Sequence, residues 1–276
     1  MCPSYPRGNK IKVIQPQDYY HQMKKPHLLF HVGDPSNFSQ AHLPNAILIQ
    51  PAELIDGSLP AIGNLPSKER LNQLLNRVGF AHEEKIFIYD EEGGGWAGRL
   101  GWTLDIIGKE DWVYIDGGIH SWHEMGFPLE AGIQSPRKQA GNITRLNMTP
   151  VAQKNDVLAA IEDQNEIIWD VRSKEEYQGL RSGSSRFGHI PGAINIDWLE
   201  LKDKERSQRL RNNIEDFLRG RGITGEKPII THCQTHHRSG LSYLVGRMLG
   251  FKIRAYAGSW AEWGNDDDTP IEISRG

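Results

Sequence analysis

The sequence predicts an α/β protein built from two similar domains, each with a mainly parallel sheet and helices on both of its faces. Two observations lead to this prediction. Short apolar runs typical of buried strands alternate with stretches of helical periodicity, as expected for a parallel sheet. The same landmarks also occur in the same order in both halves. HLPNAI at residues 42–47 returns as HIPGAI at 189–194, and the apolar run at 86–90 returns at 229–233.

The elements of the first half follow from the spacing of its apolar residues. Apolar runs at residues 28–32 and 86–90 have the length and composition of buried strands. Between them lies a helix that ends at Gly79, a typical helix stop. The residues that mark this helix recur at helical spacing: Leu71, Leu74, Leu75 and Val78.

The second half repeats this arrangement. Strands are predicted at residues 167–171, 229–231 and 253–256. A helix ending at Gly222 precedes the second of these strands, and an amphipathic helix ending at Gly250 follows it. The apolar stripe of this last helix contains Leu241, Leu244, Val245, Met248 and Leu249.

The boundary between the halves is predicted in a segment rich in Gly, Pro, Gln, Arg and Lys with little apolar periodicity. We therefore predict a first domain at residues 1–130, a linker at 131–147 and a second domain at 148–276.

Composition excludes several classes of protein. The 32 basic and 35 acidic residues give a net charge of −3, so nucleic acid is not an expected partner. No apolar run approaches the ~20 residues of a membrane helix, and the first residues do not resemble a signal peptide. Two cysteines among 276 residues exclude a disulfide scaffold and favour a reducing compartment, the cytoplasm. Cys2 lies in a Pro-flanked terminus and has no assigned role.

Cys233 is the main candidate for chemistry, because it stands where a predicted strand turns into a helix that begins near Ser239. A loop this short directs several backbone N–H groups and the positive end of the helix dipole at the sulfur. Arg238 adds a permanent positive charge, and His236 and His237 are expected to add more. These effects favour the thiolate, so we predict a nucleophilic cysteine of low pKa.

Two other interpretations of the loop remain open at this point. Cys233 could be an inert buried cysteine, although its neighbours are polar and cationic. His232, Cys233, His236 and His237 could also bind a metal ion. The adjacent histidines cannot easily turn onto one ion in a loop curled around the sulfur, so we predict no metal.

The spacing of the loop carries further information. Four residues separate Cys233 from Arg238, one fewer than in protein-phosphatase loops. The shorter ring of amides suits a group smaller than phosphate, such as a sulfur atom carried as a persulfide.

Three segments resemble the two-domain rhodanese family, and most of all its bacterial thiosulfate:cyanide members: HIPGA at residues 189–193, CQTHHR at 233–238 and GSWAEWGN at 258–265. The resemblance covers roughly residues 11–272. It implies that Cys233 takes the sulfane sulfur of thiosulfate as a persulfide and passes it to cyanide or a thiol in a ping-pong cycle. It also implies that no cofactor is needed. We expect a monomer.

The candidate site residues are assigned on this basis. Cys233 is the nucleophile and Arg238 its cationic partner, while substrate contacts are expected from Gln234, Thr235, His236, His237 and Trp198. Asp170 and Arg172 are candidates for an ion pair that braces the loop, or for a purely structural one. Mammalian-type relatives carry an arginine at the position of Glu176. This departure leaves 3-mercaptopyruvate open as the sulfur donor, and a small cysteine phosphatase or arsenate reductase is a weaker alternative.

The first half lacks the nucleophile, because Asp90 stands at the position of Cys233 and is followed by Glu91 and Glu92. We therefore predict a degenerate, non-catalytic copy that packs against the working domain. We interpret His189 as turn-forming, since His42 repeats it, and assign Trp122 and Trp263 to the core. The charged residues 202–211 are expected to form a solvated helix face or loop.

Overall fold

The computed structural model describes residues 9–132 and 143–274. Cys2 and most of the predicted linker, residues 133–142, lie outside the described residues. The described chain forms two five-stranded sheets in which every pair of neighbouring strands is parallel, together with a small two-stranded antiparallel ribbon. The predicted fold class is confirmed.

The first sheet has the order β1-β5-β4-β2-β3. Its strands are β1 (Lys12–Ile14), β2 (Leu28–Val32), β3 (Ile47–Ile49), β4 (Ile86–Asp90) and β5 (Val113–Ile115). Its helices are α1 (Pro16–Gln22), α2 (Pro35–Gln40), η1 (Pro51–Glu53), α3 (Lys68–Arg77), α4 (Gly95–Ile106) and α5 (Gly118–Glu124).

The second sheet has the order β6-β12-β11-β7-β8, which is the same order counted along its own half of the chain. Its strands are β6 (Val151–Ala152), β7 (Ile167–Asp170), β8 (Ile194–Asn195), β11 (Ile229–His232) and β12 (Ile253–Tyr256). Its helices are α6 (Lys154–Asp163), α7 (Lys174–Tyr177), η2 (Trp198–Leu201), α8 (Ile214–Arg219), α9 (Arg238–Leu249) and α10 (Ser259–Trp263).

Both faces of each sheet carry buried residues, as expected for parallel strands that are rich in apolar residues and covered by helices. Successive residues of one strand face different cores. In β4, Ile86 and Ile88 belong to a large cluster that spans both domains, whereas Phe87 and Tyr89 belong to a cluster of the first domain alone. The second domain has its own outer cluster around Trp260 and Trp263. The large shared cluster therefore joins the two sheets into one body.

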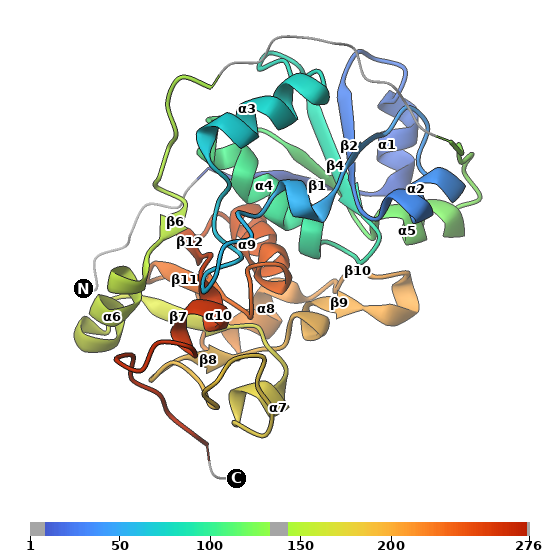
Figure 1. The fold of residues 1–276 in the computed structure, drawn as a ribbon. Helices are drawn as coiled ribbons and strands as arrows, with labels where there is room; N and C mark the ends of the chain where they lie inside the picture. The colour runs from blue at the N-terminus through green and yellow to red at the C-terminus, as the bar shows by residue number, and fades with distance from the viewer. Residues whose placement is uncertain (1–8, 133–142, 275–276) are drawn as a thin grey trace.

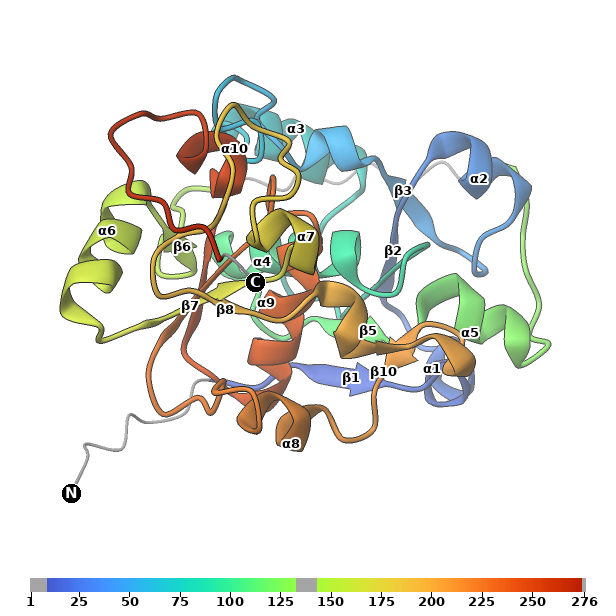
Figure 2. The same ribbon diagram turned by 90° about the horizontal axis from the view of Figure 1, so that it is seen from below.

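Helices α4 and α9 lie side by side between the two sheets (Figures 1 and 2). Each follows the strand that leads to the candidate position: α4 follows β4, which ends at Asp90, and α9 follows β11, which ends one residue before Cys233. Their close approach requires glycine, because a Cβ on Gly240 would overlap the backbone of Gly95 and a Cβ on Gly98 would overlap that of Gly240. The N-terminal turns of the two helices are thereby brought together.

The charged residues 202–211 were predicted to form a solvated helix face or loop, and the structure differs from this prediction. They contain the ribbon of β9 (Lys202–Asp203) and β10 (Arg209–Leu210), joined by η3 (Lys204–Arg206), which lies against the first domain in Figure 1. Lys202 and Arg209 are buried; the first donates to the carbonyl of Glu92 and the second pairs with Glu124. Periodicity alone could not reveal this, because the partners of these charges come from the other domain.

Candidate active site

Cys233 is the first residue after β11, and α9 begins five residues later at Arg238. The turn is anchored by the next strand–helix junction, where the N–H of Trp260 donates to the carbonyl of Cys233 and that of Ala261 to the carbonyl of Gln234. The backbone N–H of Cys233 itself donates to the hydroxyl of Ser259. Cys233 is only 1% exposed, at the base of the loop.

The surroundings of the sulfur stabilise its anion. Burial alone would raise the pKa of Cys233, but the charge of Arg238, the hydroxyl of Ser239 and backbone N–H groups outweigh it and lower the pKa. The hydroxyl of Ser239 lies 3.5 Å from Sγ, and the N–H groups belong to Thr235 and Ser239. The predicted low pKa therefore agrees with the geometry. Ser239 was missed from the sequence, although a hydroxyl directly after Arg238 in the first helical turn was a signal.

Arg238 is held by a carboxylate. Its two terminal nitrogens donate to the two oxygens of Glu176 at 2.6 and 2.9 Å, and Arg181 approaches the same carboxylate at 3.5 Å. Burial would raise the pKa of Glu176, but the hydrogen bonds and charge of Arg238 lower it to about 2. Burial would lower the pKa of the Arg238 guanidinium. Its hydrogen bonds to Glu176 and the negative charges of Cys233 and Glu176 outweigh burial and raise this pKa. The guanidinium thus interacts electrostatically with two acidic groups, Glu176 and the thiol of Cys233.

The two adjacent histidines of the loop have different environments. His236 is fully buried, and burial together with the charges of Arg99 and His237 lowers its pKa well below the usual range. It is therefore neutral and does not add the positive charge predicted from the sequence. His237 is partly exposed, and its Nε2 lies 2.6 Å from a carboxylate oxygen of Glu92.

The first domain also supplies an aromatic partner for His237. The ring of Trp96 stacks on the imidazole with centroids 4.3 Å apart, and Trp198 contacts it at 5.7 Å. The ammonium of Lys202 lies 4.0 Å from the centre of the Trp198 ring. Trp96 and Glu92 were not predicted, because nothing in the sequence of the first domain shows which loop of the second it meets.

Gln234 and Thr235 are covered by neighbouring loops. The amide of Gln234 donates to the hydroxyl of Ser184 at 3.1 Å. Gly63, in the loop between η1 and α3, lies so close to the carbonyl of Thr235 that a Cβ there would overlap it. This first-domain loop extends down toward the second domain in Figure 1. Both domains therefore contribute to the wall around the active-site loop.

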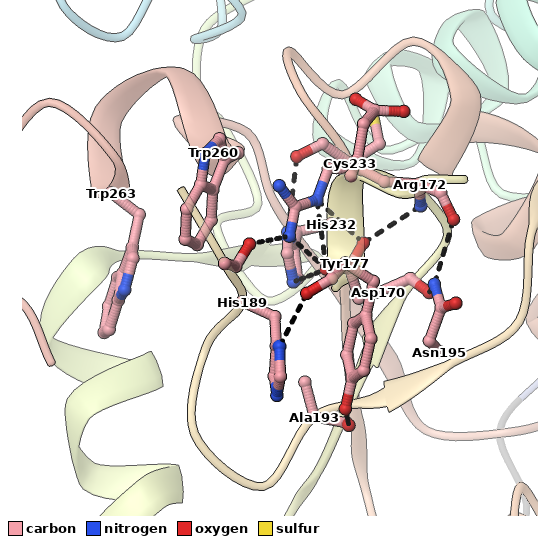
Figure 3. A network of polar contacts seen from close by, with 12 residues as sticks. Asp170, Arg172, Tyr177, His189, Ala193, Asn195, His232, Cys233, Trp260 and Trp263 are labelled. Atoms are coloured by element: carbon pink, nitrogen blue, oxygen red, sulfur yellow. Dashed lines mark hydrogen bonds and ion pairs between the residues drawn. The ribbon is translucent and has the colours of Figure 1, made fainter. Parts of the chain in front are cut away.

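Asp170 and Arg172 form an ion pair behind Cys233 (Figure 3). Both are fully buried, and a terminal nitrogen of Arg172 donates to Asp170 at 2.6 Å and to the carbonyl of Gly188 at 2.9 Å. In the sheet, Asp170 pairs with His232, the residue before Cys233. The pair therefore supports the end of β11.

Two further predictions concern structural residues. His189 Nδ1 lies 2.7 Å from the carbonyl of Tyr177, and His42 contacts that of Phe38 in the same way. Each histidine also forms an isolated antiparallel bridge with a residue near the end of its domain, His42 with Glu130 and His189 with Glu272. Trp122 and Trp263 are fully buried core residues. Both predictions agree with the structure.

The loop of the first domain has the same form but carries its own anion. The carboxylate of Asp90, fully buried, accepts hydrogen bonds from the N–H groups of Glu92, Gly93, Gly94 and Ala97 at 2.9–3.1 Å. These amides are directed at the side chain at the end of the strand, as the amides of the second domain are directed at Cys233. The first loop is thus an anion-binding nest filled by its own carboxylate.

Within the described residues, no group of three or more His, Cys, Asp or Glu side chains is arranged to hold a metal ion. None of the described helices has the length and apolar character needed to cross a membrane.

Comparison with known proteins gives a consistent result. The family model of the rhodanese-like domain matches the chain twice, at residues 15–125 and 153–266. A thiosulfate sulfurtransferase of Azotobacter vinelandii is 39% identical over 265 residues, covering 95% of this chain and 97% of the relative. A 3-mercaptopyruvate sulfurtransferase of Escherichia coli K12 is 28% identical, covering 85% and 84%. The crystal structure of the Tum1 protein from Saccharomyces cerevisiae shares the fold, with a TM-score of 0.80, 19% identity and coverage of 92% and 94%.

Proposed function

The chain belongs to the rhodanese family, and on this premise we propose that it is a thiosulfate sulfurtransferase that carries sulfur on Cys233. The observation that carries the proposal is the environment of this cysteine. Arg238, Ser239 and two backbone N–H groups together lower the pKa of its thiol, although the residue is buried. The lowered pKa increases the fraction of Cys233 present as thiolate, which is the nucleophile that sulfur transfer requires.

The reaction has two half-steps. The Cys233 thiolate attacks the sulfane sulfur of thiosulfate, the new S–S bond forms, and sulfite leaves with the electron pair of the old S–S bond. The acceptor, cyanide or a thiolate, then attacks the outer sulfur of the persulfide. Thiocyanate or an acceptor persulfide leaves, and the electron pair returns to Cys233 as thiolate. The same groups that stabilise the thiolate make it a good leaving group in this second step.

We assign the remaining residues by their place around the loop. Arg238 provides the positive charge for the donor, and Gln234, Thr235, His237 and Trp198 line the approach to it. His236 is fully buried against Ser239 and Trp102, so we remove it from the substrate-contacting set. Asp170 and Arg172 support the end of β11.

The two candidate functions differ in the sulfur donor, which is either thiosulfate or 3-mercaptopyruvate. A 3-mercaptopyruvate sulfurtransferase is 28% identical to this chain, against 39% for a thiosulfate sulfurtransferase. Thiosulfate is therefore the proposed donor. A phosphatase or arsenate reductase is disfavoured, because the loop has one residue fewer than a phosphate-binding loop.

The first experiment tests for the persulfide. The protein is incubated with thiosulfate, and the peptide that contains Cys233 is examined by mass spectrometry for the gain of one sulfur atom. The Cys233→Ser variant must show no gain, and the peptide with Cys2 provides an internal control for nonspecific sulfur uptake. Full transfer activity in Cys233→Ser would refute the mechanism.

The second experiment separates the candidate functions. Thiocyanate formation from thiosulfate and cyanide identifies an enzyme, whereas sulfur uptake without turnover identifies a sulfur carrier. Rates with thiosulfate and with 3-mercaptopyruvate are compared on the same preparation, and thiosulfate is expected to be preferred. Hydrolysis of p-nitrophenyl phosphate without sulfur uptake would favour the phosphatase.

We further propose that residues 1–130 form the non-catalytic domain and 148–276 the catalytic domain, joined by 131–147. A cytoplasmic monomer that does not bind nucleic acid or membranes is proposed from the composition.

A further inference from the structure

His236 is a buried residue for which the sulfur-transfer steps above have no use. It occupies the left-handed backbone region, with φ of 56°, and its side chain is fully buried. Its Nδ1 lies 2.7 Å from the hydroxyl oxygen of Ser239, and that hydroxyl lies 3.5 Å from Sγ of Cys233. The three side chains therefore form a continuous array that ends on the nucleophile.

The other side of the imidazole is enclosed by the first domain. Trp102 of α4 packs edge-on against it, with ring centroids 4.7 Å apart at 82°. Arg99, one helical turn earlier, places its guanidinium 4.6 Å from the centre of the Trp102 ring. Arg99 is fully buried and donates to the carbonyls of Leu54, Gly63 and Asn64, and no ion pair with a described carboxylate is found for it. It is therefore a buried positive charge near His236.

These surroundings keep His236 neutral. The charged or titratable groups that face it are Arg99 on α4 and His237 on its own loop, and both disfavour a second positive charge. Arg238 and Arg99 are the cations that act on Cys233. A neutral imidazole has one N–H donor, so the position of that proton decides what the array does.

The hydrogen bonds indicate where the proton lies. Nε2 is buried and has no hydrogen-bond partner among the described residues. A proton on Nε2 would leave a buried donor unsatisfied and would direct the Ser239 hydroxyl toward His236, away from the thiolate. A proton on Nδ1 instead lets His236 donate to Ser239 Oγ, and the hydroxyl is then free to donate to Sγ.

Resting on the proposed function, we propose that His236 is a positioning residue for sulfur transfer: it donates from Nδ1 to Ser239 Oγ, so that the Ser239 hydroxyl donates to Cys233 Sγ. The first domain would hold it in this state through Trp102 and Arg99. The first domain would then influence the reaction by keeping His236 neutral, in addition to packing against the second domain.

The test measures the pKa of Cys233 directly, from the ultraviolet absorbance of the thiolate as pH is raised, with Cys233→Ser subtracted. Ser239→Ala is expected to raise this pKa by about one to two units, since a hydrogen bond to a charged group is lost. His236→Ala is expected to raise it by about half as much. The double variant should equal Ser239→Ala alone, because the two residues act through one hydroxyl.

Two variants serve as controls. His236→Asn keeps a donor at the position of Nδ1, and asparagine tolerates the left-handed backbone, so it is expected to restore most of the wild-type pKa. His237→Asn changes the neighbouring histidine, whose ring contacts Glu92 and Trp96 of the first domain, and should leave the pKa of Cys233 unchanged. Nitrogen NMR of the wild-type protein should show a neutral His236 with the proton on Nδ1.

Two results would overturn the proposal: an unchanged pKa of Cys233 in His236→Ala together with a raised one in Ser239→Ala, or a proton found on Nε2. The NMR measurement needs no variant, so a folding defect cannot hide the answer. None of these measurements uses thiosulfate, so failure of the thiosulfate reaction and failure of the array are distinguishable.

Discussion

The ion pair between Glu176 and Arg238 yields a prediction about both stability and catalysis. Glu176 is 7% exposed and accepts two hydrogen bonds from Arg238 at 2.6 and 2.9 Å. Its pKa is lowered from 4.5 to about 2, against the opposing effect of burial. This fall corresponds to about 3 kcal/mol of favourable interaction with the ionised carboxylate. Glu176→Gln keeps one acceptor oxygen, so we expect the free energy of unfolding at neutral pH to fall by about 2 kcal/mol.

The pH dependence gives a sharper form of this prediction. Because the folded-state pKa of Glu176 lies below the unfolded value, its contribution is present in full above about pH 4.5 and is lost as pH falls toward 2. Between about pH 5.5 and about pH 3.5 the wild type should lose about 1.4 kcal/mol through this group alone. Glu176→Gln cannot show that loss, so the difference between the two proteins should narrow by this amount.

The assay is urea unfolding of both proteins at the two pH values. All other carboxylates are common to the two chains, so their contributions cancel in the difference. A stability difference that stays constant with pH would show that the charge of Glu176 does not act through Arg238 as described.

The same variant also has an expected kinetic effect. Removing the carboxylate of Glu176 leaves the positive charge of Arg238 available to a dianionic donor. The KM for thiosulfate should therefore fall about threefold or more, and a rise in KM would contradict this reasoning.

Three further predictions concern the contact between the domains and the loop of the first domain. Gly240→Ala should lower the free energy of unfolding by about 1–3 kcal/mol, because its Cβ would meet the backbone of Gly95 and force α4 and α9 apart; urea unfolding measures this. Asp90→Asn weakens the hydrogen bonds that fill the first loop and should cost about 1–3 kcal/mol, while sulfur uptake on the active-site cysteine persists. In a double-mutant cycle of Trp96→Ala and His237→Ala, the coupling energy should be about 0.5–1.5 kcal/mol, and a value near zero would mean that the stacked rings do not interact energetically.

Much of the fold could be predicted from local patterns. The strand at Leu28–Val32 and the one at Ile86–Asp90 have the predicted bounds, and α9 begins within one residue of the predicted start. These elements are determined by apolar runs that must be buried on both faces and by glycines that end the helices. The repeat predicted two similar domains, and the structure shows the same strand order in both sheets.

The site was predictable only in part. Cys233 and Arg238 lie on one loop, so their spacing in the chain already placed them together. Glu92 and Trp96 come from the other domain and contact His237 across the interface. The charges of residues 202–211 were misread for the same reason, since Lys202 is buried against the carbonyl of Glu92.

The sequence by itself determined two α/β copies and pointed to a candidate nucleophile in one of them, with an aspartate at the same position in the other. It could do so because strand burial, helix ends and a short strand–helix loop are local properties of the chain. Only the tertiary structure decided which charges the site retains. Packing buries His236 against Trp102 and makes it neutral, pairs Arg238 with Glu176, and fills the first loop with the carboxylate of Asp90. Charge states and hydrogen-bond partners depend on groups distant in the sequence and on the exclusion of water, and neither is written in the order of neighbouring residues.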